Sequence, residues 1–441
     1  MGKLFSAMND YAGGGYARFH IPGHKGAPLP YPGFGGISAL DLTEVAGLDS
    51  LYTADGVIRN TEEVCSRLYG SLDSFISAGG STLCIQAMLA TATRPGDTLI
   101  ISRGTHTAAV NAMALLDLNP EWMLPASDPV SGLSLGVTAL DVQKAVERCP
   151  DAAAVYLTSP TFFGALSDIA GISKICREYG VPLLVDNAHG AHLAFFKPNL
   201  HPMANGADIC CDSLHKTLPV LTGGAVLHIG REEYINHARK RLALFGSTSP
   251  SYLVMASIDG ALDWLSGETA AGQLQTSAKT LEEVGTFAGE LGYTISKSEP
   301  LKLTIGAGTL GYTGEEFGGY LRGEGIEPEY SGGGICVLMA SPFNPPEDFV
   351  RLKAALKSLP VRKPVLPPGL PGILPRQVMS IRQAVFGRQE VLPVEMAAGR
   401  VCGGLVAPCP PGIALIVAGE EISADSAALL KNYGISFVSV V

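Results

Sequence analysis

The sequence predicts an α/β fold in which a mainly parallel sheet is covered by helices on both faces. From about residue 61, segments with helical spacing alternate with short apolar segments that are typical of strands. Strands such as 181–186 (VPLLVD) are apolar throughout and directly follow a predicted helix, which is typical of buried strands in parallel sheets. The 53 glycines and 30 prolines among 441 residues indicate many turns between short elements. These features predict a doubly wound large domain joined to smaller parts.

The elements of the large domain follow from apolar spacing and from the residues that begin and end helices. Thr61 is the expected N-cap of the first helix, and Gly70 is expected to end it. Pro95 and Gly96 are expected to stop the second helix. The predicted helices are 61–70, 81–94, 106–117 and 172–180. The predicted strands are 74–80, 98–102, 152–160, 181–186, 207–213 and 223–230.

The chain divides into four predicted parts. Residues 1–60 are an N-terminal arm, rich in glycine, proline and aromatic residues, with little periodicity. Residues 61–275 form the large domain and end in a long linker helix from about 251. Residues 276–360 alternate strands and helices in a small α+β domain, and 361–441 form a strand-rich C-terminal extension that begins within a proline-rich segment.

Composition excludes several classes of protein. The chain is 46% apolar and 16% charged, which is typical of a globular protein and not of a disordered one. A net charge of −10 argues against a nucleic-acid-binding protein. No apolar run is long enough to span a membrane, and the first ten residues lack the apolar segment of a signal peptide. Nine scattered cysteines without a CxxC pair indicate reduced thiols and a cytoplasmic protein.

Polar residues follow two of the predicted strands. Asp186 ends one strand, and Ser213, His215 and Lys216 lie at the end of the next. Ligands of open α/β sheets bind beyond the carboxyl ends of the strands. A lysine amine can form a Schiff base with the aldehyde of pyridoxal 5'-phosphate, and a carboxylate can keep the pyridine nitrogen protonated. The pattern therefore predicts a pyridoxal phosphate site with Lys216 and Asp186.

A phosphate site is predicted where Ser81 and Thr82 open a helix after a pair of glycines. Backbone N–H groups at a helix start bind anions, although the same four residues also suit a turn with an N-cap. Ser213 and His215 are further candidate phosphate contacts. His106 begins the helix 106–117 at the same edge of the sheet, where it either stacks on the cofactor ring or only starts the helix.

The motifs and their order resemble the ornithine/lysine/arginine decarboxylase family, whose members are pyridoxal phosphate enzymes with the aspartate-aminotransferase fold. The resemblance covers nearly the whole chain and suggests a short form without the additional N-terminal domain of the large inducible decarboxylases. The similar segments are His20–Gly26, Asp41–Asp49, Gly80–Thr82, Arg103–His106, Ser159–Thr161, Asp186–His192, Ser213–Thr217, Thr248–Tyr252 and Pro410–Gly412.

The resemblance implies a role for each candidate residue. Lys216 is implied to bind the cofactor, Asp186 to pair with the pyridine nitrogen, and His106 to stack on the ring. His189 is implied to lie beside the ring. The implied phosphate contacts are Ser81, Thr82, Ser213 and His215. Thr248 and Ser249 are implied to complete the phosphate site of a neighbouring subunit, which predicts a homodimer or a higher homo-oligomer with shared active sites.

The implied reaction is the decarboxylation of lysine, ornithine or arginine to the corresponding amine and CO2, as in polyamine biosynthesis. A cationic substrate needs an acidic wall, for which Glu44, Asp49 and Asp55 of the arm are candidates, although each also suits a solvated loop. The alternatives are an aminotransferase or aldolase reaction on the same fold, or an inactive regulatory homologue. Loss of the lysine would be expected of the inactive homologue, and Lys216 is present.

The chain departs from the usual family sequence at several positions. Asn187 stands where the family usually has glutamate, and Asp212 stands where glutamine is common. Leu83 and Cys84 replace smaller or polar residues, and Cys409 precedes the final Pro-Pro-Gly. None of these changes touches Lys216 or Asp186, so they leave cofactor binding as expected and the choice of substrate open.

Two weaker motifs are set aside. Residues 306–311 fit GxGxxG, but Thr313 and Glu316 predict that the helix begins only after these glycines, so they are expected to form a loop. His189 and His192 are spaced as HxxH, without a third ligand nearby, and no metal site is predicted.

Overall fold

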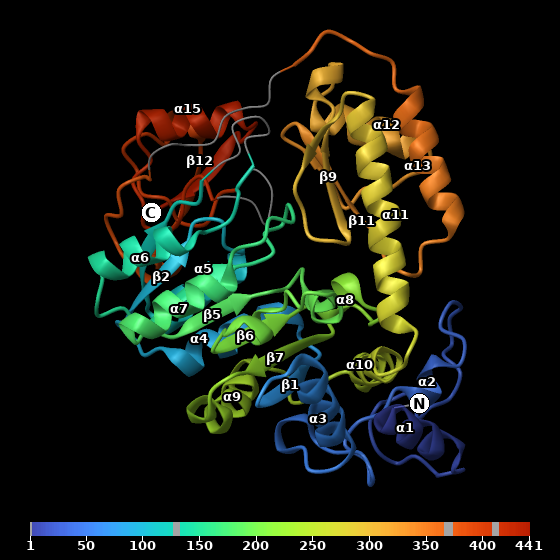
Figure 1. The fold of residues 1–441 in the computed structure, drawn as a ribbon. Helices are drawn as coiled ribbons and strands as arrows, with labels where there is room; N and C mark the ends of the chain where they lie inside the picture. The colour runs from blue at the N-terminus through green and yellow to red at the C-terminus, as the bar shows by residue number, and fades with distance from the viewer. Residues whose placement is uncertain (1, 127–132, 366–373, 408–413) are drawn as a thin grey trace. The chain divides into compact units, whose positions relative to one another are not determined.

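The computed structural model describes residues 2–126, 133–365, 374–407 and 414–441 (Figure 1). The chain forms two compact units. The first unit contains residues up to 92 together with 184–272, and the second contains 93–183 and 273–441. The four predicted parts divide the chain differently, and their boundaries stay predictions. Within the described residues, no helix combines the length and the apolar character needed to cross a membrane.

A seven-stranded sheet confirms the predicted α/β fold. The strand order is β1-β7-β6-β5-β4-β2-β3. The strands are β1 (Asp73–Ser77), β2 (Thr98–Ser102), β3 (Asn119–Met123), β4 (Ala154–Thr158), β5 (Leu183–Asp186), β6 (Ile209–Asp212) and β7 (Ala225–Ile229). β2 is parallel to β3 and β4, and β5 is parallel to β6, whereas β7 is antiparallel to both β1 and β6. The sheet is therefore mainly parallel, as expected, with one reversed strand.

The first unit contains ten helices among the described residues, three of which lie in the N-terminal arm. They are α1 (Lys3–Gly13), α2 (Ile37–Leu40), η1 (Leu51–Thr53), α3 (Val57–Tyr69), α4 (Gly80–Ala92), η2 (Ala191–Phe195), η3 (Pro202–Asn205), α8 (Leu214–Thr217), α9 (Glu232–Phe245) and α10 (Tyr252–Leu265). α1 packs on α3 and α10, and the N–H of Phe5 donates to Asp259 Oδ2 at 3.1 Å. The beginning of the arm is thus part of the folded unit.

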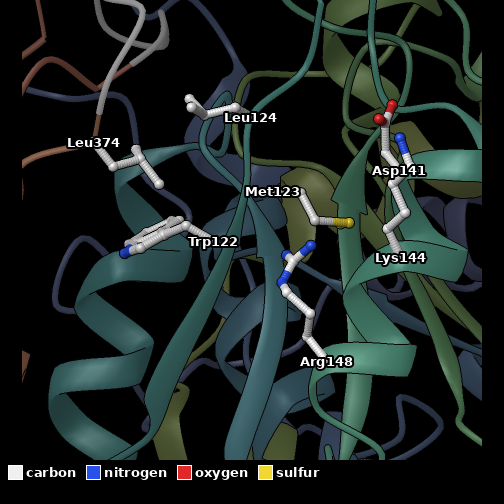
Figure 2. A pocket seen from close by; sticks show the side chains of 7 residues that line it. All are labelled: Trp122, Met123, Leu124, Asp141, Lys144, Arg148 and Leu374. Carbon is white, nitrogen blue, oxygen red and sulfur yellow. The ribbon is translucent and has the colours of Figure 1, made fainter.

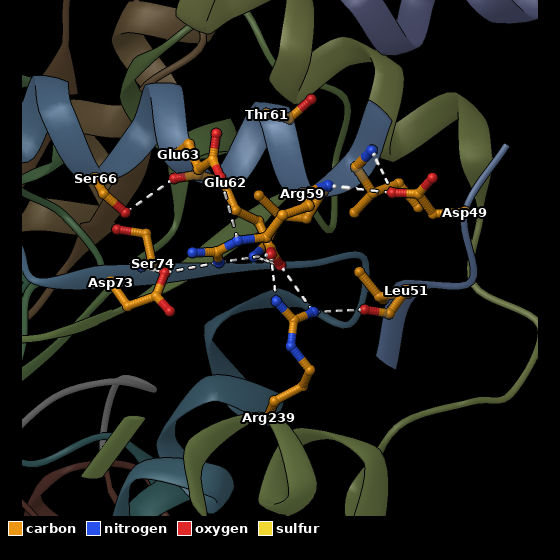
Figure 3. A network of polar contacts seen from close by, with 12 residues as sticks. Asp49, Leu51, Arg59, Thr61, Glu62, Glu63, Ser66, Asp73, Ser74 and Arg239 are labelled. Carbon is orange, nitrogen blue, oxygen red and sulfur yellow. Dashed lines mark hydrogen bonds and ion pairs between the residues drawn. The ribbon is translucent and has the colours of Figure 1, made fainter. Parts of the chain in front are cut away.

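The expected start of the first helix at Thr61 is wrong, because α3 already begins at Val57. Its cap comes from a residue distant in sequence, Asp49, whose carboxylate accepts four backbone N–H groups (Figure 3). Oδ2 accepts from Gly56, Ile58 and Arg59 at 2.7, 2.9 and 3.3 Å, and Oδ1 accepts from Val57 at 3.1 Å. Gly70 ends the helix in the left-handed region, as predicted.

This helix carries a buried carboxylate. Glu62 is fully buried and contacts the guanidinium groups of Arg239 and Arg59 (Figure 3). Arg239 also donates to the carbonyl of Leu51 at 2.8 Å, and Arg59 donates to Asp73 at 2.8 Å. Burial raises the pKa of Glu62 to about 7, against the opposing charges of the two arginines. The network joins the arm to α3, β1 and α9.

The second unit contains the remaining strands of the large sheet and two further sheets. Its helices are α5 (Thr107–Leu116), α6 (Ala139–Arg148), α7 (Ile169–Tyr179), α12 (Gly314–Gly323), α13 (Pro346–Ser358), α14 (Ile381–Phe386) and α15 (Ala424–Asn432), with η4 (Gly308–Leu310) and η5 (Val394–Met396). The long α11 (Ala270–Glu290) begins at the end of the first unit. Its other strands are β8 (Thr294–Ser296), β9 (Lys302–Gly306), β10 (Tyr330–Gly332), β11 (Ile335–Met339), β12 (Glu390–Pro393) and β13 (Phe437–Val440).

These strands form an antiparallel sheet, β10-β11-β9-β8, and the separate pair β12-β13. Figure 1 shows β9 and β11 beside α11, α12 and α13, which share an apolar core with them. Gly306 ends β9, Gly308 begins η4 and Gly311 follows it, so these glycines precede α12, whose expected capping box is formed by Thr313 and Glu316. The Pro410–Gly412 segment lies outside the described residues.

Candidate active site

Lys216 and His189 lie together in the first unit. Lys216 is on α8, the short helix that follows β6, and His189 follows β5. The Nζ atom of Lys216 and the Nε2 atom of His189 are 3.0 Å apart. His189 is buried and Lys216 is partly buried. The two neighbouring parallel strands thus bring these two candidate residues together at their carboxyl ends, where α/β sheets bind ligands.

Asp186 is the last residue of β5 and is 1% exposed. Its Oδ1 atom accepts the N–H of Ala188 at 3.1 Å, and the Sγ atom of Cys211 on β6 lies 3.8 Å away. A buried carboxylate held by a backbone N–H has a fixed direction and a strong electrostatic effect in its low-dielectric surroundings. This position suits a carboxylate that pairs with a protonated ring nitrogen.

The predicted phosphate site is the N-terminus of the 13-residue helix α4. Gly80 begins the helix with a φ of +68° and donates its N–H to the carbonyl of Gly223 at 2.8 Å. A Cβ on Gly79 would lie 2.8 Å from Leu83 Cδ2, so the side chain of Leu83 would have to shift. Ser81 is partly buried and Thr82 is exposed in the first turn. Their hydroxyl groups and those N–H groups of the first turn that have no acceptor within the helix form a site with the chemistry of an anion binder.

Ser213 and His215 flank Lys216 in the same loop and helix. Ser213 is fully buried, and within the described part of the chain its Oγ atom has no hydrogen-bond partner. His215 Nδ1 lies 2.9 Å from the carbonyl of Gly224, so Nδ1 carries a proton, and Nε2 can donate to a phosphate only when the ring is protonated. A buried hydroxyl without a partner is costly, and an anionic ligand would satisfy it. The residues present therefore fit pyridoxal phosphate.

His106 lies in the second unit, where it is the N-cap of α5. Its Nδ1 atom accepts the N–H of Ala108 at 3.0 Å, which fixes the ring. Its neighbour Thr105 is 2% exposed, and its Oγ1 atom has no partner among the described residues. No sequence signal distinguished this threonine from an ordinary turn residue.

Thr248 and Ser249 lie in the exposed loop between α9 and α10. In the described ranges, no hydrogen bond joins either residue to Lys216 or to Asp186. Their expected role at the site of a neighbouring subunit stays a prediction.

The two departures Asn187 and Asp212 contact each other. Asn187 Nδ2 donates to Asp212 Oδ1 at 2.6 Å, while Asp212 Oδ2 accepts from His201 at 2.9 Å and from His228 at 3.2 Å. All four side chains are fully buried. Although burial alone would raise the pKa of Asp212, its interactions with His201 and His228 hold this pKa below its ordinary value. The network joins the carboxyl ends of β5 and β6.

Cys210, Asp212 and His201 also lie close enough to suggest a metal site. The tautomer of His201 argues against it. Its Nδ1 atom accepts the N–H of Met203 at 3.3 Å, so Nε2 carries the proton that it donates to Asp212. An imidazole nitrogen that carries a proton cannot bind a metal, and hydrogen bonds account for this cluster.

The arm carboxylates differ in what they contact. Asp49 is occupied as the cap of α3 and accepts four N–H groups, so it does not fit the acidic wall for a cationic substrate. Glu44 and Asp55 are exposed.

A pocket of about 240 Å³ in the second unit contains none of the predicted site residues (Figure 2). Its charged side chains include Asp141, which belongs to the capping box of α6, and Arg148, which binds Glu121 at 2.8 Å. Lys144 and Trp122 also line it. The existing contacts of Asp141 and Arg148 give this pocket no evident catalytic group.

Solved structures define the fold. The fold matches the lysine decarboxylase LdcF of Francisella novicida with a TM-score of 0.80 and 18% identity, over 99% of this chain and 81% of that chain. It matches the constitutive lysine decarboxylase of Escherichia coli with a TM-score of 0.79 and 20% identity, over 99% and 78%. The fold is that of the pyridoxal-phosphate-dependent enzymes related to aspartate aminotransferase.

Sequence comparison then identifies the family. Residues 3–291 match the major domain of Orn/Lys/Arg decarboxylase, and residues 366–434 match its C-terminal domain. The arginine decarboxylase of Halalkalibacterium halodurans is 31% identical over 97% of this chain and 92% of that protein. The chain belongs to the Orn/Lys/Arg decarboxylase family, as the motifs suggested, and is a pyridoxal-phosphate-dependent amino acid decarboxylase.

Proposed function

We propose that this enzyme removes the α-carboxylate of a basic amino acid and that arginine is its substrate. Four relatives named arginine decarboxylase are 29–31% identical and align over 92–96% of their length. The constitutive lysine decarboxylase of Escherichia coli is 23% identical and aligns over 74% of its length. The products would be CO2 and the corresponding amine.

The contact between Lys216 and His189 carries the assignment of the site. Lys216 is the amine proposed to bind the cofactor covalently, and the adjacent imidazole of His189 can take or return a proton at Nζ. Asp186 is proposed to hold the proton of the ring nitrogen. When bound, pyridoxal phosphate supplies a ring that accepts the electron pair of the breaking bond. Lys216 and His189 are then the candidates for returning a proton to Cα.

The phosphate is proposed to lie at the start of α4. Ser81 and Thr82 offer hydroxyl groups there, and Ser213 offers a buried hydroxyl without a partner among the described residues. His215 would add a charged donor when protonated. His106 is proposed to stack on the ring. Thr248 and Ser249 are proposed to serve a neighbouring subunit, because their loop is exposed.

A homo-oligomer is proposed because the arm also exposes apolar side chains. The arm exposes five large apolar side chains over residues 16–34, and Phe19 is 96% exposed. Grouped exposed apolar residues of this kind are typical of protein interfaces. The full group is Tyr16, Phe19, Ile21, Tyr31 and Phe34. The proposal adds no nucleic acid, membrane or metal partner.

Substrate and reaction are tested together with the purified holoenzyme. Arginine, lysine and ornithine are offered separately, and released CO2 and amine are both quantified. We expect CO2 and an equal amount of amine from arginine, with much slower release from the others. A faster reaction with lysine or ornithine would assign that amino acid as the substrate in place of arginine. A keto acid without CO2 would indicate transamination. No reaction with any of the three would overturn the proposal.

The cofactor site is tested with Lys216→Ala. This variant should lose the visible absorbance that borohydride bleaches, and its decarboxylase activity should fall by at least about 1,000-fold, because the covalent attachment and a proton carrier are both removed. Lys174→Ala changes an exposed lysine of α7 and should behave as the wild type. Equal absorbance and activity in the Lys216→Ala and wild-type proteins would exclude Lys216 as the residue that binds the cofactor.

A further inference from the structure

The C-terminal extension binds the segment that leads to His106 through a buried ion pair. Arg103 and Glu420 are each 1% exposed and 317 residues apart in sequence. The two Nη atoms of Arg103 donate to the two carboxylate oxygens of Glu420 at 2.6 and 2.7 Å. Such a two-point contact fixes the direction of both side chains as well as their distance.

The remaining polar atoms of the pair are also used. Arg103 Nε donates to the carbonyl of Ala414 at 2.9 Å, and its guanidinium lies 4.9 Å from the ring centre of Trp122. Glu420 Oε2 accepts the N–H of Val417 at 2.7 Å. Apolar side chains would stabilise such a contact at least as well, because burying two charges is costly. The pair is therefore better explained by the geometry it imposes than by stability.

The pair lies close to His106 along the chain. Arg103 is the first residue after β2, its N–H donates to Met123 at 2.9 Å, and only Gly104 and Thr105 separate it from His106. Within this link the N–H of Gly104 donates to Ser102 Oγ at 3.3 Å, and Thr105 is buried. Arg103 is thus a charged anchor three residues before His106, and the link between them is short and held.

The same extension also holds the other end of α5. Arg382, on α14, donates from Nη1 to the carbonyls of Ala114 and Leu115 at 3.1 and 2.9 Å, and α14 packs on α5. The extension therefore binds the chain on both sides of the α5 N-cap at His106.

We propose that Glu420 is a positioning residue that holds the His106 ring in place through Arg103. The C-terminal extension would then take part in catalysis without touching the substrate. This inference rests on the proposed stacking of His106 on the cofactor.

The test compares Glu420→Gln with Glu421→Gln, which changes the neighbouring, partly buried glutamate. Hydrogen exchange is measured first without cofactor, on peptides containing the Ala108 amide, which donates to His106 Nδ1. We expect at least about tenfold faster exchange of this segment in Glu420→Gln, and no change at the capped start of α6. In the loaded enzyme kcat should fall about tenfold and the cofactor absorbance should shift, with little change in KM.

Glu421→Gln should match the wild type in every measurement. If Glu420→Gln does not fold, Arg103→Lys keeps the charge, loses the two-point contact and should give the same pattern. Wild-type exchange and kcat in the folded variant would overturn the proposal. Faster exchange in a protein that binds no cofactor would contradict the proposed function while leaving the anchoring of His106 supported.

Discussion

Asp212 shows how one buried carboxylate can order the ends of two strands. Its two oxygens accept three hydrogen bonds, from Asn187, His201 and His228. The amide group of a glutamine would replace one acceptor oxygen by an N–H donor. Asn187, in turn, presents an amide N–H to the carboxylate. The two departures from the family sequence thus complement each other in hydrogen bonding.

Asp212→Asn should therefore be strongly destabilising. Loss of the buried charge leaves the histidine donors with a weaker acceptor, and we expect the free energy of unfolding to fall by about 3–5 kcal/mol. Urea denaturation of the holoenzyme measures this change. Asp208→Asn, which changes a more exposed carboxylate paired with Arg231 at 3.3 Å, should cost less than about 1 kcal/mol. Equal losses in the two variants would contradict the role of the network.

His228 makes stability depend on pH. Burial lowers the pKa of His228 in the folded protein, against the hydrogen bond to Asp212. A histidine with a lowered folded pKa contributes stability that is present above its unfolded pKa of about 6.5 and is lost as the pH falls below that value. The free energy of unfolding should fall by up to about 1.4 kcal/mol per pH unit between about pH 6.5 and 5.

The pH dependence is measured as the urea midpoint at each pH. His228→Gln should have a smaller slope over this range, and His237→Gln, at an exposed site on α9, should keep the wild-type slope. An unchanged slope in His228→Gln would assign the acid sensitivity to other groups.

The sequence could predict reactive side chains that directly follow the carboxyl end of a predicted strand. Lys216 and Asp186 follow from this rule, whereas His189 was implied by the family resemblance, and the structure places Lys216 beside His189. Asp49 could not be predicted as a helix cap, because its partners begin seven residues later and the contact depends on how the arm folds back. The same holds for Glu420, whose partner lies 317 residues away.

Among the elements, the N-terminus of α4 can be tested directly as the proposed phosphate site. Gly80→Ala would place a side chain at a φ of +68°, and left-handed backbone costs about 1–2 kcal/mol for a residue with a Cβ. Because the N–H groups of this turn are the proposed phosphate site, affinity for pyridoxal phosphate should fall at least about tenfold. Titration of the apo-protein with pyridoxal phosphate, followed by absorbance, measures this affinity.

Gly70→Ala is the matched control. Gly70 has a φ of +70° and, like Gly80, has open space where a Cβ would be added. It should lose similar stability and keep the wild-type affinity. Equal affinity in both variants would remove the start of α4 from the cofactor site.

The elements of the large domain were largely predictable because buried strands and capped helices have strong sequence patterns. The start of α3 was not, because its cap lies outside the helix sequence. β3 contains Asn119 and Pro120, which are rare in strands, and was missed. The reversed direction of β7 could not be read from its apolar sequence, since strand direction depends on the connection and not on composition.

At the scale of the whole molecule, the exposed apolar arm predicts association. Phe19→Asp should shift the holoenzyme toward smaller species at micromolar concentration, because a charge at a 96% exposed aromatic position would be buried by a partner. Light scattering after gel filtration measures the mass. Phe386→Asp, at a 62% exposed phenylalanine on α14, should leave the mass unchanged. A monomeric wild type would overturn the proposed homo-oligomer.

The capping of α3 by Asp49 limits how this protein can be shortened. A gene trimmed to begin after residue 50 would remove the acceptor for four N–H groups and leave the first turn of α3 without its cap. It would also remove the N–H that Phe5 gives to Asp259. The arm has few regular elements, so it could be taken for a segment that the fold does not need. Its deletion is nevertheless expected to give insoluble protein. Shortened versions for crystallisation should therefore keep this region intact.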